Sequence, residues 1–197
     1  MKIINSLRLL STRIMQSSTT WSLRVVYPLF GSIEFKGLKH IDHNKRYLFV
    51  ANHKSFGDVY AIFIGMSLIN LWRCSPTRFM TSSHVYYTLL RPVIMLGGGF
   101  PTKRSRAHYS AVHQSIDYLR NNQNVVIFPE GGRVQSKSSR PHTGVVRIIE
   151  GCDFPIEVIA VHIDWQKRGR KRHLRVVHSP CTDTSSAEAI MDAIYAL

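Results

Sequence analysis

The sequence predicts one α/β domain, with a mostly buried mixed sheet flanked by helices and an amphipathic helical segment in front of it. Short apolar runs of strand length alternate with longer segments whose apolar residues recur at helical spacing. The 197 residues, 44% of them hydrophobic, suffice for one domain with its own core. No linker or internal repeat interrupts this pattern, so we place the N-terminal segment at 1–30 and the domain at 31–197.

The first 30 residues form a basic, amphipathic leader. Ile3, Leu7, Leu10 and Ile14 recur at helical spacing with cations between them, and no acidic residue precedes Glu34. No apolar run reaches the roughly 18 residues of a transmembrane helix, and no signal-peptide pattern is present. Such a leader predicts a helix that lies in the plane of an anionic membrane surface. The alternative is a helix that packs its apolar stripe on the domain.

The elements of the domain follow in order. Short apolar runs between turn residues predict strands at 47–51, 78–81, 125–128, 156–165 and 174–178. Helical spacing predicts helices that begin near 59 and that cover 84–95, 107–119, 143–150 and 185–197. Pro92 should kink or shorten the second helix, and Ser185 or Ser186 should cap the last. The basic segment 167–172 is predicted to be a solvated hairpin loop, or alternatively a contact for lipid headgroups or an acidic carrier protein.

A histidine and an aspartate stand five positions apart between the first strand and the first helix. Ser55 and Asp58 have capping-box spacing, which predicts a helix with Ser55 as its N-cap. The loop can then fold His53 onto the first turn, where the helix N-terminus favours an ionised Asp58. A carboxylate that accepts the proton of one ring nitrogen leaves the other nitrogen basic. The alternative is that Asp58 only caps the helix and His53 is a loop residue.

Two further segments have residues suited to binding anions. Phe128-Pro129-Glu130-Gly131-Gly132-Arg133 follows a predicted strand, at the carboxyl end where α/β sheets bind ligands. Its glycines allow close backbone approach, and Arg133 can hold a phosphate. The segment 100–106 has three cations just before a predicted helix. The alternative for 128–133 is a surface turn with a local ion pair between Glu130 and Arg133, and the alternative for 100–106 is a solvated basic turn.

The charge balance restricts the partners. With 26 Lys and Arg against 12 Asp and Glu, the formal net charge is +14. Such a chain favours a phosphorylated substrate, an anionic lipid surface, an acidic carrier protein or nucleic acid. Nucleic acid is the distant alternative, since zinc-finger, RNP-type and strong helix-turn-helix patterns are absent. Three scattered cysteines form no metal or redox framework and favour a reduced, cytoplasmic-facing location.

Together these segments resemble the glycerolipid acyltransferases of the lysophosphatidic acid acyltransferase type. The family's N-H-x-x-x-x-D motif is matched by Asn52, His53 and Asp58, and its F-P-E-G-T-R motif by 128–133. The second and fourth blocks of the family are loosely similar to 100–104 and 154–158. Order and separations agree from about residue 33 to 178.

The sequence departs from the family pattern in the second, third and fourth of these blocks. Gly132 replaces the usual threonine, Val158 replaces a proline, and Lys103 stands where an acidic residue is common. These departures leave His53 and Asp58 untouched. They concern the identity of the acceptor, because the second and third blocks shape the family's acceptor site.

The resemblance implies a membrane-associated enzyme of phospholipid biosynthesis. It would move a fatty acyl group from an acyl-CoA or acyl-carrier-protein thioester to the free hydroxyl of a lysophosphatidic acid-like acceptor. His53 is then the general base and Asp58 its orienting partner, with no acyl-enzyme, metal or bound cofactor. Arg104 and Arg133 would anchor the phosphate, Glu130 would place a polar group of the acceptor, and Gly131 would keep the backbone close.

Several alternatives to this acceptor and activity stay open. Glycerol 3-phosphate, another lysophospholipid or a lyso-aminolipid could replace lysophosphatidic acid as the acceptor. An alternative to an enzyme is a non-catalytic lipid-binding protein of the same fold.

Overall fold

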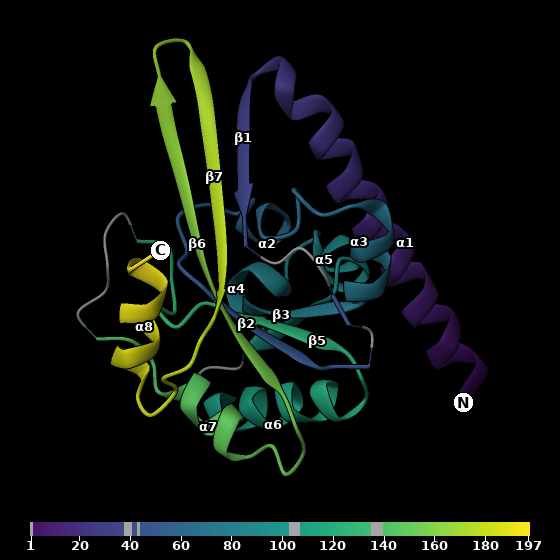
Figure 1. Cartoon of the computed structure of the whole chain (residues 1–197). Coiled ribbons are helices and arrows are strands. Elements are labelled where there is room, and N and C mark those ends of the chain that lie inside the picture. The colour runs from purple at the N-terminus through teal and green to yellow at the C-terminus, as the bar shows by residue number, and fades with distance from the viewer. Residues whose placement is uncertain (1, 38–40, 43, 103–106, 135–139) are drawn as a thin grey trace.

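A computed structural model describes residues 2–37, 41–42, 44–102, 107–134 and 140–197 (Figure 1). Its described part contains one seven-stranded sheet of order β1-β7-β6-β2-β5-β3-β4. The strands are β1 Gly31–Lys36, β2 Tyr47–Ala51, β3 Thr77–Ser82, β4 Gly99–Thr102, β5 Asn124–Ile127, β6 Glu157–Arg168 and β7 Lys171–Pro180. The β6–β7 pair is antiparallel and the other neighbours are parallel. The predicted α/β class with a mixed sheet is confirmed.

Helices cover both faces of this sheet. They are α1 Lys2–Val26, the 3-10 helix η1 Tyr27–Leu29, α2 Asp58–Ala61, α3 Leu68–Cys74, α4 Ser83–Tyr86, α5 Arg91–Leu96, α6 Ala107–Arg120, α7 Gly144–Glu150 and α8 Ala187–Tyr195. Alternate residues of β2 belong to two cores: Phe49 packs with α2 and α3, and Leu48 packs with α6, α7 and α8. Because β2 is buried on both faces, it reads as a continuous apolar run.

Several predicted boundaries need correction. The helix that begins near 59 is only the four residues of α2, and 84–95 is divided into α4 and α5. Pro92 stands in the first turn of α5, where its missing N–H is harmless, so it neither kinks nor ends that helix. Edge strands β1 and β4 were not predicted, because they contain glycine or proline and few consecutive apolar residues. Ser186 caps α8, as one of the two predicted candidates.

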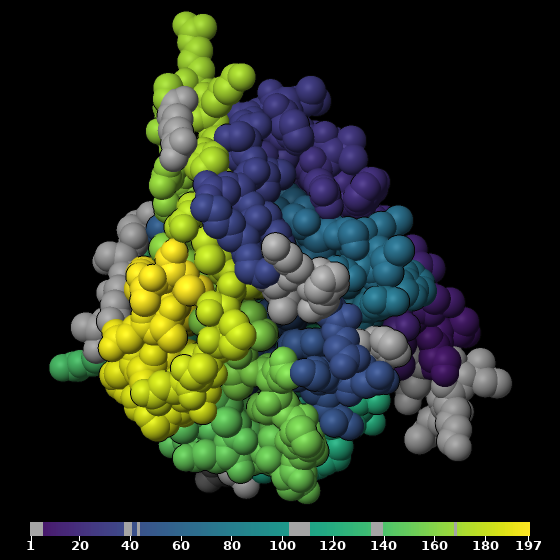
Figure 2. All heavy atoms as spheres, in the orientation of Figure 1, coloured from purple at the N-terminus to yellow at the C-terminus, as the bar shows by residue number. Residues whose placement is uncertain are grey.

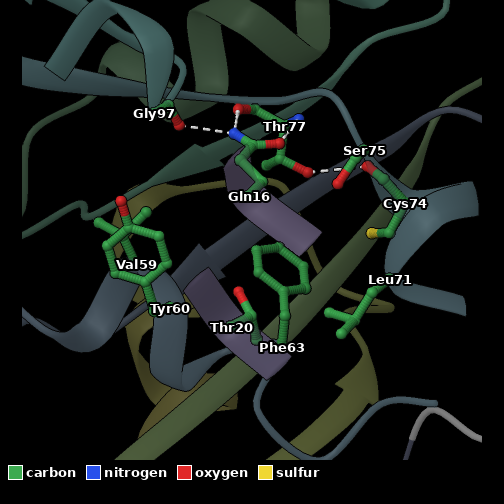
Figure 3. A pocket seen from close by; sticks show the side chains of 10 residues that line it. All are labelled: Gln16, Thr20, Val59, Tyr60, Phe63, Leu71, Cys74, Ser75, Thr77 and Gly97. Carbon is green, nitrogen blue, oxygen red and sulfur yellow. Dashed lines mark hydrogen bonds between the residues drawn. The ribbon is translucent and has the colours of Figure 1, made fainter. Parts of the chain in front are cut away.

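The first helix docks on the domain through polar side chains. Thr12, Ser17 and Thr20 are buried in this contact. The Gln16 amide donates to the carbonyl oxygens of Thr77 and Gly97, each at 2.6 Å, and its oxygen accepts from the Thr77 N–H at 3.0 Å (Figure 3). Gln16 thereby satisfies backbone groups of β3 and of the turn before β4, and a small cavity of about 20 Å³ remains beside it.

One set of apolar residues of α1 points away from the domain. An exposed stripe runs along the helix through Leu7, Leu10, Ile14, Trp21 and Val25. The predicted amphipathic helix is therefore present, but the alternative in which this apolar stripe packs on the domain is wrong. Among the described helices, none is long and apolar enough to cross a bilayer.

A buried histidine makes the fold sensitive to acid. His178 on β7 packs on Phe35, with ring centroids 4.8 Å apart, and burial lowers its pKa to about 4. In the unfolded chain the same group titrates near 6.5. The stabilising contribution is therefore complete above about pH 6.5 and is lost as the pH falls towards 4, because the unfolded state then binds a proton that the native state excludes.

We expect His178→Gln to flatten the acid dependence of stability. The wild-type free energy of unfolding should fall by up to about 3 kcal/mol more than the variant's between pH 6.5 and 4. Urea unfolding at several pH values measures this difference. His84→Gln, at an exposed histidine, is the matched control and should follow the wild type. Parallel curves for wild type and His178→Gln would refute this origin of the acid sensitivity.

Candidate active site

The carboxyl ends of β2 and β5 bring the two strongest sequence motifs together. These strands are parallel neighbours, with Val50 opposite Ile127 near their ends. The chain leaves β2 into 52–58 and leaves β5 into 128–134. The Val134 N–H donates to the His53 carbonyl oxygen at 2.8 Å, and the His53 N–H donates to Glu130 Oε2 at 2.7 Å. The two motifs thus form one site.

His53 and Asp58 form the dyad that their spacing predicts. His53 Nδ1 lies 2.9 Å from Asp58 Oδ2. The same oxygen accepts the backbone N–H groups of Lys54 and Ser55, each at 2.6 Å. The other oxygen, Oδ1, accepts the indole N–H of Trp165 at 2.7 Å. Asp58 is fully buried, so these four contacts fix the carboxylate in one position.

The predicted N-cap at Ser55 is wrong. Helix α2 begins at Asp58, with Gly57 as its N-cap and no side-chain cap. One half of a capping box is present, since the Asp58 carboxylate reaches back to the Ser55 N–H. The other half is missing, because Ser55 Oγ accepts from the Gly57 N–H instead. The carboxylate therefore serves the loop and His53 more than the helix end.

Asn52 fixes the start of this loop. Its buried amide donates to the Ile163 carbonyl oxygen at 2.8 Å, and its oxygen accepts the Ile163 N–H at 2.7 Å. The β2–β6 ladder has its last backbone pair at Ala51 and Val161, and the Asn52 side chain extends that pairing. The asparagine of the motif thus holds the loop to β6 and positions the residue that follows it.

The orientation of the His53 ring leaves one nitrogen for chemistry. The ring stacks on Phe128 with centroids 4.2 Å apart and planes 21° apart. Its side chain is 18% exposed. Within the part of the chain that the structure describes, the ring is hydrogen-bonded through Nδ1, which leaves Nε2 available to a substrate at the mouth of the site.

Glu130 is buried and connects three segments of the chain. Oε2 accepts the His53 N–H, and Oε1 accepts the Tyr195 hydroxyl of α8 at 2.6 Å. Burial raises the pKa of Glu130, although both of these hydrogen bonds act to lower it. Both oxygens have partners inside the protein, so this geometry gives Glu130 a role in holding His53 and α8. Its predicted contact with the acceptor stays a prediction.

The two glycines after Glu130 differ in how tightly the structure constrains them. Gly131 has φ +69°, and a Cβ there would collide with the His142 ring, so both the backbone and the space favour glycine. Gly132 has no atom within 4 Å of where its Cβ would stand. The departure from the family's threonine at Gly132 is therefore not imposed by crowding.

The two predicted phosphate anchors have different outcomes. The exposed Arg133 places its guanidinium 3.9 Å from the ring centroid of Phe56, over the loop that holds the dyad. Arg104 lies outside the described residues, as does Lys103. The described strand before them, β4, ends at Thr102 and shares its direction with β2, β5 and β3. The chain therefore leaves β4 at the carboxyl end of these parallel strands, which is the end of the sheet where His53 lies.

Sequence reasoning missed Trp165 and Tyr195. Trp165 lies on β6, and its ring also packs on Tyr27 of η1, 6.1 Å between centroids. The sequence offered one signal for Trp165: a tryptophan on a half-buried strand needs an acceptor for its indole N–H. His162 and Asp164, predicted to be structural, lie beside the site: the Asp164 carboxylate accepts from Lys54 Nζ at 3.1 Å and the His162 ring packs on Tyr195.

A cleft of about 940 Å³ lies away from the dyad, at the β4 edge of the sheet. It is lined by residues of α1, α5 and α6, and Arg78 is held in its wall by Gln123 Oε1 at 2.6 Å. None of the predicted site residues in the described chain lines it.

Comparisons with known proteins concern the family and the fold of the chain. The Acyltransferase family matches residues 32–162, which contain the dyad, Glu130 and Arg133 but neither Trp165 nor Tyr195. The chain's fold is similar to the crystal structure of PlsC from Thermotoga maritima, a 1-acyl-sn-glycerophosphate (LPA) acyltransferase. The TM-score is 0.61 and the identity 17%, over 93% of this chain and 75% of that one. A comparison with curated proteins found no match. The family match spans well over half of the sequence, and the chain belongs to the Acyltransferase family.

Proposed function

We propose that this protein moves a fatty acyl group from an acyl thioester to the free hydroxyl of a lysophosphatidic acid-like acceptor at a membrane surface. The observation that carries the proposal is the His53–Asp58 dyad at the mouth of the site, with His53 Nδ1 bonded and Nε2 available. The similarity to an LPA acyltransferase from Thermotoga maritima supports this choice of acceptor over glycerol 3-phosphate or a lyso-aminolipid.

The dyad supports direct transfer. Asp58 accepts a hydrogen bond from Nδ1–H and holds the ring, so Nε2 takes the proton of the acceptor hydroxyl. The hydroxyl oxygen then forms a bond to the carbonyl carbon of the thioester. When the resulting tetrahedral species collapses, the carbon–sulfur bond breaks, and the thiolate leaves with the proton held by His53. The products are the ester and the free thiol of coenzyme A or of acyl carrier protein, with His53 again neutral.

Arg133 is suited to hold the acceptor's phosphate. Its guanidinium lies on Phe56, within the loop that runs from His53 to Asp58. Arginine binds phosphate oxygens through two parallel N–H donors, which orients the ligand as well as attracting it. We propose the same function for Arg104. Holding the phosphate beside the dyad would place the free hydroxyl next to Nε2, and such positioning supplies much of the rate enhancement in reactions of this kind.

The outward stripe of α1 supports a membrane location. The helix docks through Thr12, Gln16 and Thr20, while Leu7 and Trp21 face out. A soluble helix has the reverse arrangement, with its apolar side on the core. A basic helix with an exposed apolar face and a tryptophan lies in a membrane interface, at the cytoplasmic face in this proposal.

Removal of the proposed base should slow turnover strongly. We expect His53→Ala to lower kcat by roughly 10²–10⁴-fold, since that is what a general base contributes. Asp58→Asn should also be strongly impaired, because the buried amide loses one acceptor and misorients the ring. Mass spectrometry of products from acyl-CoA and acyl-carrier-protein donors with a panel of lysolipids measures this. His84→Ala is the control at an exposed histidine. Undiminished transfer by His53→Ala, or no transfer by the wild type, would refute the mechanism.

Trp165 should act through Asp58. Trp165→Phe keeps a ring in place but removes the N–H that donates to Asp58 Oδ1. We expect kcat to fall about tenfold, the value of one hydrogen bond to a charged group, with KM unchanged. Trp72→Phe, at an exposed tryptophan of α3, should match the wild type. A raised KM with normal kcat would instead place Trp165 in substrate binding.

Arg133 should discriminate acceptors by their charge. We expect Arg133→Ala to raise KM for lysophosphatidic acid roughly ten- to a hundredfold, since a charge-assisted hydrogen bond is lost. Transfer to an uncharged monoacylglycerol should change little. Arg147→Ala, at an exposed arginine of α7, serves as control. Equal slowing with both acceptors would exclude Arg133 as the phosphate anchor.

A further inference from the structure

The β6–β7 hairpin extends beyond the end of β2, and β1 accompanies β7 along it as far as Gly31. The pairing of β2 with β6 stops at Val161, whereas β6 and β7 stay paired as far as Arg168 and Lys171. The turn is the dipeptide Gly169-Arg170, and Gly169 has φ +63°, as the first residue of a tight hairpin turn needs. In Figure 1 the hairpin rises above the rest of the molecule. The predicted solvated loop at 167–172 is thus mostly strand.

The tip of this hairpin is strongly basic. Lys167, Arg170, Lys171 and Arg172 are exposed, and the sequence has no acidic residue between Asp164 and Asp183. The acids closest along the two neighbouring strands have other partners. Asp164 accepts from Lys54 and Gln166, and Glu34 pairs with Lys36, His173 and Arg175. The positive charge of the tip is therefore not neutralised by these carboxylates.

The exposed apolar end of α1 lies against the base of the basic tip. Leu29 is 79% and Phe30 63% exposed, and Val25 and Val26 are exposed beside them. The Arg172 N–H donates to the Phe30 carbonyl oxygen at 3.1 Å. Gly31 stands opposite Arg172 in the β1–β7 pair, with no room for a Cβ. Figure 2 shows both segments at the same end of the molecule.

We propose that these two segments together form a membrane-docking edge for an anionic lipid surface. The edge consists of Val25, Val26, Leu29, Phe30, Lys167, Arg170, Lys171 and Arg172. Its apolar part would enter the interface while the four cations contact lipid phosphates. An acidic carrier protein would match the charge but leaves Leu29 and Phe30 without a reason to be exposed, so a membrane satisfies both halves. The inference rests on the proposed function, in which the acceptor is a membrane lipid.

Strand β6 connects the docking edge with the dyad. Trp165 stands two residues before Lys167 on β6, donates to Asp58 and packs on Tyr27 of η1. One tryptophan therefore contacts the carboxylate of the site and the segment between α1 and β1. Docking through this edge would hold the dyad close to the lipid headgroups, where the acceptor's hydroxyl lies.

Vesicle binding tests the edge without relying on catalysis. Sedimentation of the full chain with phosphatidylcholine vesicles, with and without phosphatidylglycerol, gives the partition coefficient. For the triple variant Lys167→Gln, Arg170→Gln, Lys171→Gln we expect roughly a hundredfold weaker binding to anionic vesicles, about fivefold per charge. The loss should shrink at high salt. For Leu29→Gln with Phe30→Gln we expect weaker binding to both vesicle types at all salt concentrations.

A matched control removes the same charge elsewhere. Lys45→Gln, Arg120→Gln, Arg147→Gln lowers the net charge equally at exposed positions outside the edge and should bind vesicles nearly as the wild type does. Equal losses in both triple variants would overturn the proposal in favour of a nonspecific charge effect. If the hairpin variant binds vesicles normally but loses only transfer from acyl carrier protein, the partner is that protein and the proposal is wrong.

Catalysis with soluble substrates separates this proposal from the proposed function. With short-chain donor and acceptor in the absence of vesicles, the hairpin variant should retain wild-type turnover. Wild-type protein that binds vesicles through the edge yet shows no acyl transfer would refute the function and leave the docking edge standing. Thermal unfolding of each variant verifies that the exposed substitutions leave the fold intact.

Discussion

A buried carboxylate organises this site. Asp58 has no contact with solvent, so its two oxygens must be satisfied by protein donors. The donors are the imidazole of His53, the backbone N–H groups of Lys54 and Ser55 in the loop before α2, and the indole of Trp165 on β6. Each donor that satisfies Asp58 also loses freedom itself. The need to solvate one charge thereby fixes the loop, the ring of His53 and the start of α2.

A second buried carboxylate joins this loop to the rest of the fold. Glu130 binds the His53 N–H with one oxygen and the Tyr195 hydroxyl with the other. The loop after β5, the loop after β2 and the last helix therefore meet at one residue. Two acidic side chains, both withdrawn from solvent, hold the histidine by its backbone and by its ring, and within the described residues this leaves Nε2 available.

The polar docking of α1 has a consequence for the whole surface. Gln16 satisfies backbone groups of β3 and of the turn before β4, which anchors the helix without burying its apolar residues. The stripe from Leu7 to Val25 and the end at Phe30 are left exposed. The Trp165 contact with Tyr27 then places the exposed end of this helix next to the dyad. An exposed apolar surface and the His53–Asp58 dyad are thus connected through Tyr27 and Trp165.

The sequence by itself determined the α/β class, the buried strands β2 and β5, and the pairing of His53 with Asp58, because apolar runs and a short-range spacing are local properties. Edge strands β1 and β4, the division of 84–95 and the outward stripe of α1 depended on what each segment packs against. The contacts of Trp165 and Tyr195 needed the tertiary structure most. Trp165 is 107 positions from Asp58 and Tyr195 is 65 from Glu130. No periodicity encodes a hydrogen bond over such a separation, since only the folded sheet brings β6 and α8 to the carboxyl ends of β2 and β5.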